Sequence, residues 1–578
     1  MFEERAAPSP FVVLWRAFFR QFFTSETVSS DDQLRQTIVW VLATLLLPGL
    51  FLMIELFFDY QGIVLRALKD RQFDLLDDTL EWVALLFITY SMVTAGFIAV
   101  CVWDVLTFDT RDAAVLGPLP VRGATIVAAK VMALAGFLLA ASTAVNLSNA
   151  TVFAFATADR LGFAVLLRHL VAHLTATVGA ATFIFAVIVV IRGAAGLLAG
   201  PRGAAIVGSL LQFIFVLALL AVVILCPAVW KIPHRALVNP ETTGWLPTSW
   251  FLGLFEGLRG SRRPYFAPLA VRAVVAIAVV VAGAVVTSIA GFQREMRRAL
   301  APSASLSAGG AVRLTRKLAR CLVGRDRVAV ATSEFMLLTI ARNRAQQTPI
   351  AINMAIGVAV VLAGLTRIQS LASLSHPRTA VLWIPLVFAY WMTIGMRAAF
   401  FVPSELAASW TFRANAPEHA IGYWSGVRAS MLACVLPPTL ALAGAVTIPL
   451  LGWRTAAWHA MVVLVVGTMI VEGCALTIDF VPFTRAYRSG HSKLKTRWWL
   501  YVLGLYLLAY VPARFELWAI GNLARSAPLL AALVVAVALA EIAGLRRAPR
   551  WHAQSREDPG DQPWSFTVLD IAGVTQNA

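Results

Sequence analysis

Charged residues are scarce in this sequence. They make up 14% of its 578 residues, whereas hydrophobic residues make up 59%. A soluble protein of this length needs more polar surface to cover its hydrophobic cores. The composition therefore excludes an ordinary soluble protein and favours one that is surrounded by lipid.

Cysteine is also rare, and its five residues are isolated from one another. No CxxC pair is present, so neither a disulfide framework nor a zinc site is indicated. His169 and His173 have the i, i+4 spacing of a metal-chelating pair, but no carboxylate or third histidine stands near them in the sequence. We expect both histidines at a wetted, interfacial end of a helix, and we predict no metal site.

The motifs of soluble enzyme chemistry are missing as well. The sequence contains no GxxxxGK[ST] loop to bind nucleotide phosphates, no HExxH and no GxSxG. The chain therefore has no P-loop with which to hydrolyse ATP. We predict a protein that is not an enzyme and binds no cofactor itself.

Long apolar runs are abundant. Most are about 20 residues long, the length at which a helix crosses a hydrocarbon core of about 30 Å. The predicted spans are 37–57, 80–103, 123–146, 162–191, 204–230, 269–291, 349–366, 379–401, 427–451, 457–480, 498–513 and 527–545. The sequence thus predicts an all-α polytopic membrane protein with about 12 transmembrane helices.

Basic residues lie mostly in alternate loops. With both termini on the inner side, the inner segments carry roughly 30 Lys and Arg and the outer segments roughly 15, which is the bias of cytoplasmic loops. The net charge of +17 is explained by this topology and does not indicate nucleic-acid binding. The arginine-rich and alanine-rich composition is typical of a bacterial protein, so we expect a multi-pass protein of the bacterial inner membrane with both termini in the cytoplasm.

Two halves of six spans share a pattern. Each half has a proline-rich polar stretch after its second span and enters its third span through a basic residue. These residues are Pro118, Pro120 and Lys130 in the first half and Pro403, Pro417 and Arg428 in the second. Since six spans return the chain to the same side, the halves would form a parallel repeat, which makes the chain a fused pseudo-dimer.

The spans and loops predict five regions along the chain. They are a cytoplasmic N-terminus at 1–36 with an amphipathic interfacial helix from Phe11 to Phe23, a first six-helix half at 37–291, a basic cytoplasmic linker at 292–348, a second six-helix half at 349–545 and a cytoplasmic tail at 546–578.

Few charged residues fall inside the predicted spans. Glu472 is the deepest, and Asp479 lies seven residues further along, near the same helical face. A charge at mid-span is costly and is expected to be functional or paired. The two carboxylates could form a cation or proton site. We favour instead a pairing of Glu472 with a basic side chain of a neighbouring span and a position of Asp479 at the cytoplasmic interface.

Several loop segments resemble those of a known family. The segment Asp112 to Lys130, DAAVLGPLPVRGATIVAAK, resembles a cytoplasmic element of ABC-type export permeases of the type-2 class, in which a short loop ending in LP precedes a helix that opens with a lysine. The segments Leu246 to Gly260, Phe335 to Arg342, Phe401 to Arg413 and Pro482 to Gly490 are similar to those of some bacterial members. The familiar permease has about six spans, so a chain of about twelve is similar to two fused copies or to a long form.

The resemblance implies a permease subunit that exports a substrate, which the sequence does not identify, with energy from a separate cytoplasmic ATPase. ATP and Mg²⁺ would be bound by that partner chain. The implied ATPase-coupling residues are Arg111, Asp112, Pro118, Pro120, Lys130, Glu405, Arg413, Glu418 and Arg428. Membrane lipid is the other expected partner, nucleic acid is not expected, and the resemblance also allows a homodimer.

Two other functions are compatible with the sequence. Twelve spans in two halves also describe an ion-coupled secondary transporter, in which Glu472 and Asp479 would be the coupling residues. A membrane-embedded transferase would need acidic groups at one membrane face, and only Asp104, Asp109 and Asp112 gather in this way.

Overall fold

The structure is a computed structural model. It describes residues 9–22, 54, 60, 62–64, 66, 69, 74–103, 105–108, 110–158, 162–229, 244–261, 263–300, 316–317, 319–321, 323–324, 326–365, 379–402, 420–478, 482–483, 494–520 and 522–557. Apart from residue 54, the predicted first span at 37–57 lies outside these residues, and so does the end of the tail from residue 558.

The described secondary structure is helical throughout, with no strand in these residues. Among the described residues, ten helices are long and apolar enough to cross a membrane. The prediction of an all-α polytopic membrane protein is therefore confirmed, whereas the number of twelve spans stays a prediction. The predicted fifth span corresponds to a helix whose described apolar part, Val207–Val223, is shorter than the other ten.

The chain divides into two compact units. Unit 1 comprises Met1–Leu306 and Met354–Arg367, and unit 2 comprises Ser307–Asn353 and Ile368–Ala578. The helices of unit 1 are α1 (Pro10–Gln21), α3 (Asp74–Cys101), α4 (Thr110–Leu116), α5 (Gly123–Ala158), α6 (Phe163–Leu198), α7 (Gly200–Val229), α10 (Pro247–Arg259) and α11 (Phe266–Leu300). Those of unit 2 are α13 (Arg327–Arg342), α15 (Thr379–Phe400), α17 (Ala420–Leu451), α18 (Trp453–Ala475), α19 (Leu494–Leu505), the π-helix η4 (Tyr506–Tyr510), α20 (Val511–Ala519) and α21 (Leu523–Glu557), while α14 (Arg344–Leu365) begins in unit 2 and ends in unit 1.

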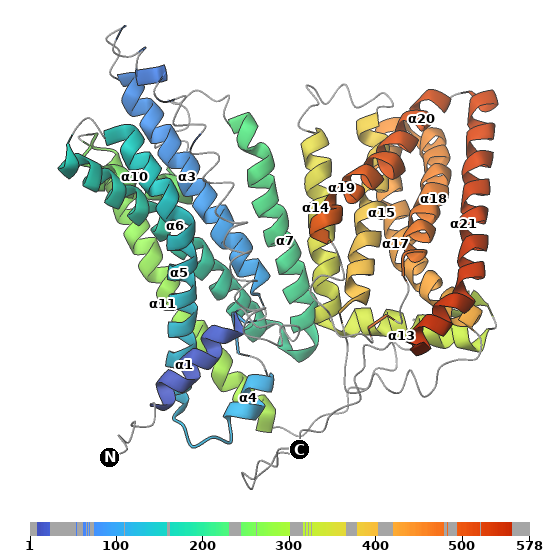
Figure 1. Ribbon diagram of the computed structural model, residues 1–578, viewed down its shortest axis with the longest axis horizontal. Coiled ribbons are helices and arrows are strands. Elements are labelled where there is room, and N and C mark those ends of the chain that lie inside the picture. The colour runs from blue at the N-terminus through green and yellow to red at the C-terminus, as the bar shows by residue number, and fades with distance from the viewer. Residues whose placement is uncertain are drawn as a thin grey trace, which may run out of the picture. The chain divides into compact units, whose positions relative to one another are not determined.

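Unit 1 is built around α6, which packs against α3, α5, α10 and α11. Its core is aromatic, with Phe87, Phe153, Phe251 and Phe255 completely buried. The amphipathic α1 packs across α5 and buries Leu14 and Phe18. The helices α1 and α4 lie at one end of this unit and α10 lies at the other, so different helices form its two ends (Figure 1).

Unit 2 is built around the pair α17 and α18, with α15 and α21 packed against both. The helix α13 is capped at its N-terminus by Asp326, whose carboxylate accepts hydrogen bonds from the backbone N–H groups of Val328 and Ala329. It packs on α17 where that helix carries Gly422 and Gly426. In this unit α13 lies at one end and α20 at the other (Figure 1).

Large apolar faces remain uncovered in both units. In the most apolar 18-residue stretch of α11 only 11% is buried, and in that of α21 only 6% is buried. Valine and leucine side chains such as Val271, Val279, Val535 and Leu539 are exposed there. Such surfaces are unfavourable in water and favourable in hydrocarbon, which supports a position within a membrane.

One detail differs from the sequence-based expectations. The third predicted span was placed at 123–146, but α5 continues to Ala158 because Asn146 and Asn149 are buried within the unit instead of facing water. Asn146 donates a hydrogen bond to Ser91 of α3 at 2.8 Å. Within the predicted linker at 292–348 lie the end of α11 and all of α13, and the segment after Leu246 forms α10.

Candidate functional site

The lysine at the start of α5 joins three elements of unit 1. The side chain of Lys130 is 3% exposed, and its Nζ donates hydrogen bonds of 2.8 Å to the Thr107 carbonyl and to an Asp112 carboxylate oxygen. The ammonium also lies 4.4 Å from the ring centre of Phe108 and 5.3 Å from that of Phe18. Lys130 therefore ties α1 and α4 to α5.

The segment from α4 to α5 projects apolar side chains. Val115 is 69% exposed and Leu119 is 44% exposed, and Pro118 and Pro120 are exposed beside them. Behind this exposed tip α4 packs against α11, where the nearest atom of Met296 lies 3.0 Å from a Cβ built on Gly117. The backbone of Arg111 belongs to α4, but its side chain lies outside the description. The tip is thus a small apolar protrusion on a well-anchored base.

The corresponding basic residue of unit 2 forms a network between three helices. Arg428 of α17 pairs with Glu472 of α18, and its Nη1 lies 2.9 Å from Glu541 of α21. Glu472 is completely buried. The deepest predicted carboxylate is therefore paired with a basic side chain of a neighbouring span.

Four other predicted residues lie outside the described part of the chain. Glu405, Arg413 and Glu418 fall in the segment 403–419, and Asp479 follows the last described residue after α18. Asp104 and Asp109 are outside it too. The structure therefore brings together Asp112 and Lys130, and also Arg428 and Glu472, among the predicted site residues.

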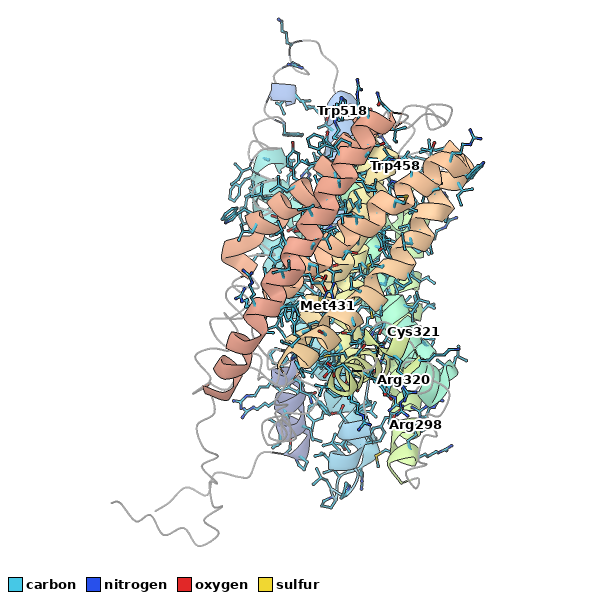
Figure 2. The ribbon with its side chains drawn as sticks, turned by 90° about the vertical axis from the view of Figure 1, so that its right-hand side faces the viewer. Arg298, Arg320, Cys321, Met431, Trp458 and Trp518 are labelled. Carbon is cyan, nitrogen blue, oxygen red and sulfur yellow. The ribbon has the colours of Figure 1, made fainter. Side chains whose placement is uncertain are left out.

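A second buried pair in unit 2 was not predicted. The His459 ring of α18 and the Glu516 carboxylate of α20 are completely buried, and His459 Nδ1 lies 2.9 Å from both carboxylate oxygens. Figure 2 marks this end of the unit by the neighbouring residues Trp458 and Trp518. The π-helix η4 directly precedes α20, and such irregular turns are frequent at functional sites.

Unit 1 has a charged cluster formed by α3, α10 and the residues just after α10. Glu256 of α10 is completely buried, and one of its carboxylate oxygens lies 3.1 Å from Arg259. Arg259 also contacts Asp77 at 3.0 Å, and Arg263 contacts Glu81 at 2.7 Å. Burial raises the pKa of Glu256 from 4.5 to about 7, against the opposing effect of Arg259. This carboxyl lies outside the ten candidate spans and is poised to titrate near neutral pH.

The expectation of wetted histidines on α6 was wrong. His169 is 5% exposed and His173 is 1% exposed. His173 packs among the rings of Phe87, Phe153 and Phe255, with the Phe153 ring centre at 4.4 Å. No cluster of three metal-ligating side chains occurs among the residues that the structure describes.

No protein-family model, curated protein or solved structure matches this chain. The resemblance of the segment 112–130 to export permeases therefore stays a prediction, and function has to be argued from the geometry of the two units.

Proposed function

We propose that this chain is the permease subunit of an ATP-driven ABC-type exporter, which moves its substrate with energy from a separate cytoplasmic ATPase. The observation that carries the proposal is the set of contacts that Lys130 makes with α1 and α4. A short helix outside the spans, α4, ends in an exposed apolar tip and is tied through one buried lysine to α1 and α5. A surface that receives force from a partner needs this combination of an accessible tip and a rigid base.

Similarities between helices of the two units support the proposed duplication, although most of α14, the first span of the predicted second half, falls in unit 1. The helix α6 begins after Gly162 with φ +94° and ψ +158°, and α18 begins after Gly452 with φ +79° and ψ +163°. A histidine, His169 or His459, stands seven residues after each glycine. Positive φ is rare outside glycine, so a shared cap of this kind is unusual between unrelated helices.

Packing within each unit follows the same scheme. An amphipathic helix crosses the third predicted span in both units, α1 on α5 and α13 on α17. At the other end lies a short helix with proline in its first turn, α10 in unit 1 and α20 in unit 2, and each packs near the fourth span. Each carries a phenylalanine followed by a completely buried glutamate, and the phenylalanine is buried in α10 and about half exposed in α20. These Phe-Glu steps are Phe255–Glu256 and Phe515–Glu516. We infer that the units are copies of one ancestral half, with both termini in the cytoplasm.

The mechanism follows from these contacts. The ATPase would bind the tip formed by Val115, Leu119 and the two prolines, and ATP-driven closure of the ATPase would move α4. Lys130 would pass this movement to α5 and, through Phe18, to α1. Differential affinity of the ATPase for two arrangements of the helices is then converted into a change of helix packing.

The test is affinity purification of the tagged chain from native membranes, followed by identification of co-purifying chains and assay of ATP hydrolysis. Leu119→Ser should reduce the amount of retained ATPase severalfold. The matched control is Leu198→Ser, because Leu198 is also an exposed leucine at a helix end but lies outside the tip. Equal retention in both variants, or the absence of any ATPase from the wild-type preparation, would contradict the proposal.

One observation favours the ion-coupled secondary transporter as a second candidate. The buried pair of His459 and Glu516 lies within candidate spans, where ionisable groups often carry protons. This function would now use the His459–Glu516 pair together with, or in place of, Glu472 and Asp479. It predicts substrate uptake or release driven by a pH gradient in vesicles that contain only this chain, and loss of that transport in Glu516→Gln.

A further inference from the structure

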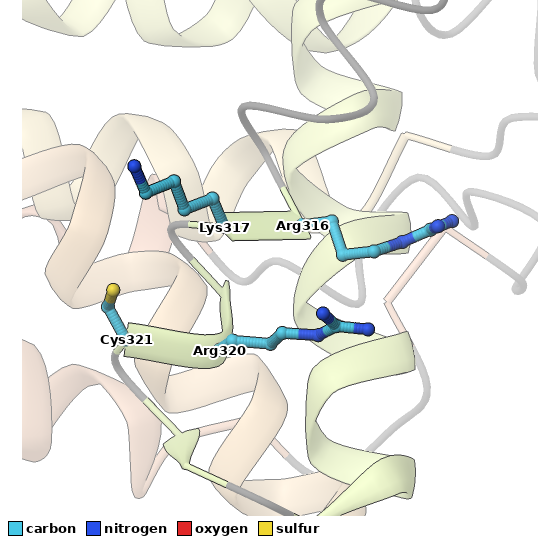
Figure 3. Close-up of a pocket in the computed structure, with 4 residues that line it drawn as sticks. All are labelled: Arg316, Lys317, Arg320 and Cys321. Carbon is cyan, nitrogen blue, oxygen red and sulfur yellow. The ribbon is translucent and has the colours of Figure 1, made fainter.

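An open pocket of about 440 Å³ lies in unit 2 just before α13. It is lined by Arg316, Lys317, Arg320 and Cys321, all of them exposed and all on successive helical turns. Figure 3 shows Arg316 and Arg320 extending side by side to one side of this segment, and Lys317 and Cys321 to the other. Arg316 and Arg320 therefore form a pair of guanidinium groups on one side of the recess, and Lys317 lies on the other side.

The charge of this pocket is only partly balanced. The carboxylate of Glu334 on α13 accepts hydrogen bonds from Nε of Arg316 at 2.9 Å and from Nη2 at 3.0 Å. This ion pair holds the Arg316 guanidinium against α13. Neither Lys317 nor Arg320 forms an ion pair with a described residue, so Arg320 can bind an anionic ligand beside Arg316, and Lys317 adds positive charge on the other side of the recess.

The pocket also lies at one end of the spanning helices of unit 2. Figure 2 shows Arg320 and Cys321 at the end of the unit opposite Trp458 and Trp518. Exposed tryptophans such as Trp518 are typical of one membrane interface, which places the pocket toward the other. The amphipathic α13 continues from the pocket and adds exposed Arg327 and Arg342 at its two ends. Basic segments at this level are attracted to anionic headgroups.

We propose that this pocket binds the phosphate group of an anionic phospholipid headgroup. Guanidinium groups bind phosphate oxygens in a bidentate manner, which suits the side of the recess that Arg316 and Arg320 form, while Lys317 adds a point charge on the other side. The volume is within the range of small-ligand sites, about 300–1,000 Å³. Binding would fix the position of α13, because Arg316 joins the pocket to that helix through Glu334. The inference does not depend on an ATPase partner.

Cys321 provides a direct probe of occupancy. The purified full-length chain is placed in nanodiscs of phosphatidylcholine alone or of phosphatidylcholine with phosphatidylglycerol, and labelling of each cysteine by a soluble maleimide is followed by peptide mass mapping. We expect phosphatidylglycerol to slow the labelling of Cys321 severalfold. Cys101, which is also exposed but belongs to unit 1, is the internal control and should label at the same rate in both.

Variants then distinguish lipid binding in the pocket from attraction of the lipid to general surface charge. Lys317→Gln and Arg320→Gln should each weaken lipid affinity about fivefold and restore labelling. The reason is that each basic side chain near an anionic surface increases the affinity about fivefold. The matched control Arg342→Gln removes an exposed arginine of α13 outside the pocket and should retain protection. Equal labelling of Cys321 in the two lipids, or protection that persists in both pocket variants, would overturn the proposal. Protection by soluble glycerol phosphate in phosphatidylcholine nanodiscs would assign the pocket to a soluble phosphate compound and overturn the lipid assignment.

Discussion

His459 of α18 and Glu516 of α20 form a completely buried pair, in which the ring Nδ1 lies 2.9 Å from each carboxylate oxygen. Removing one partner leaves the other buried without its hydrogen bonds, which costs roughly 3–5 kcal/mol when the survivor is charged. We expect Glu516→Leu and His459→Phe each to lower the midpoint of thermal unfolding in detergent. The double variant should recover part of this loss.

The control for this pair is Phe515→Leu, since Phe515 is the neighbour of Glu516 but is 52% exposed. Its unfolding midpoint should stay close to that of the wild type. A double variant as unstable as the sum of both single variants would show that the two side chains do not interact.

Lys130→Met removes the ammonium that joins α4 to α5 and leaves Asp112 without this partner. Since α4 is only seven residues long, it has little stability of its own. We expect the backbone amides of residues 110–117 to exchange with solvent faster, by about tenfold for a loss of roughly 1.4 kcal/mol. Hydrogen exchange read by mass spectrometry measures this effect.

Two comparisons make the Lys130 prediction specific. Arg454→Met, which removes an exposed arginine at the start of α18, should leave exchange in α4 unchanged. Retained ATPase should fall in Lys130→Met if the proposed function is right. Unchanged exchange in Lys130→Met would mean that α4 is held by its packing on α11 alone.

The spanning helices could be predicted because burial in lipid depends on long apolar runs, which the sequence displays directly. Within the predicted amphipathic segment from Phe11 to Phe23, the structure has the helix α1 (Pro10–Gln21), which the apolar spacing of three and four residues predicts. Hydropathy failed where a span contains buried polar groups. Asn146 was assigned to the end of a span, although its hydrogen bond to Ser91 keeps it inside the unit.

The site residues were harder to predict, since a sequence does not state which charges meet. Glu516 was missed because the span was ended at residue 513, where Arg514 and Glu516 follow, and nothing local indicates that His459 satisfies the carboxylate. A signal was nevertheless present. The Phe-Glu steps at Phe255 and Phe515, and the histidines seven residues after Gly162 and Gly452, were visible in the sequence and indicate the same pair of positions in each half.

Glu256 should make the stability of unit 1 depend on pH. Burial raises its pKa from 4.5 to about 7 in the folded chain, with Arg259 acting in the opposite direction. Between these two values the folded state holds a proton that the unfolded state has lost, so stability decreases as pH rises from about 4.5 to about 7 and then levels off. The loss is on the order of 3 kcal/mol.

The measurement is the unfolding midpoint at pH 5 and pH 8 for the wild type and for Glu256→Gln. The variant cannot ionise at this position, so the difference between its two midpoints should be smaller than that of the wild type. Asp77→Asn is the comparison, because it keeps Glu256 and removes a half-exposed carboxylate that pairs with the same Arg259, so most of the pH dependence should remain. An identical pH dependence in the wild type and Glu256→Gln would show that the carboxyl does not titrate in this range.

Gly426 should be intolerant of any side chain, because α13 and α17 approach each other there without a gap. A Cβ at this position would lie 2.6 Å from the Ala329 carbonyl oxygen and 2.6 Å from Thr332 Cβ. The first of these atoms belongs to the backbone and cannot move alone, so Gly426→Ala should displace α13.

Gly473→Ala is the matched control, since Gly473 also lies in a helix and has open space around its Cβ direction. Alanine there should be neutral or stabilise the fold by up to about 1 kcal/mol, because it restricts the unfolded chain. Protease cleavage after the arginines that bound α13, Arg327 and Arg342, reports the displacement. It should be faster in Gly426→Ala than in the wild type and unchanged in Gly473→Ala, and equal rates in all three would show that α13 does not depend on this contact.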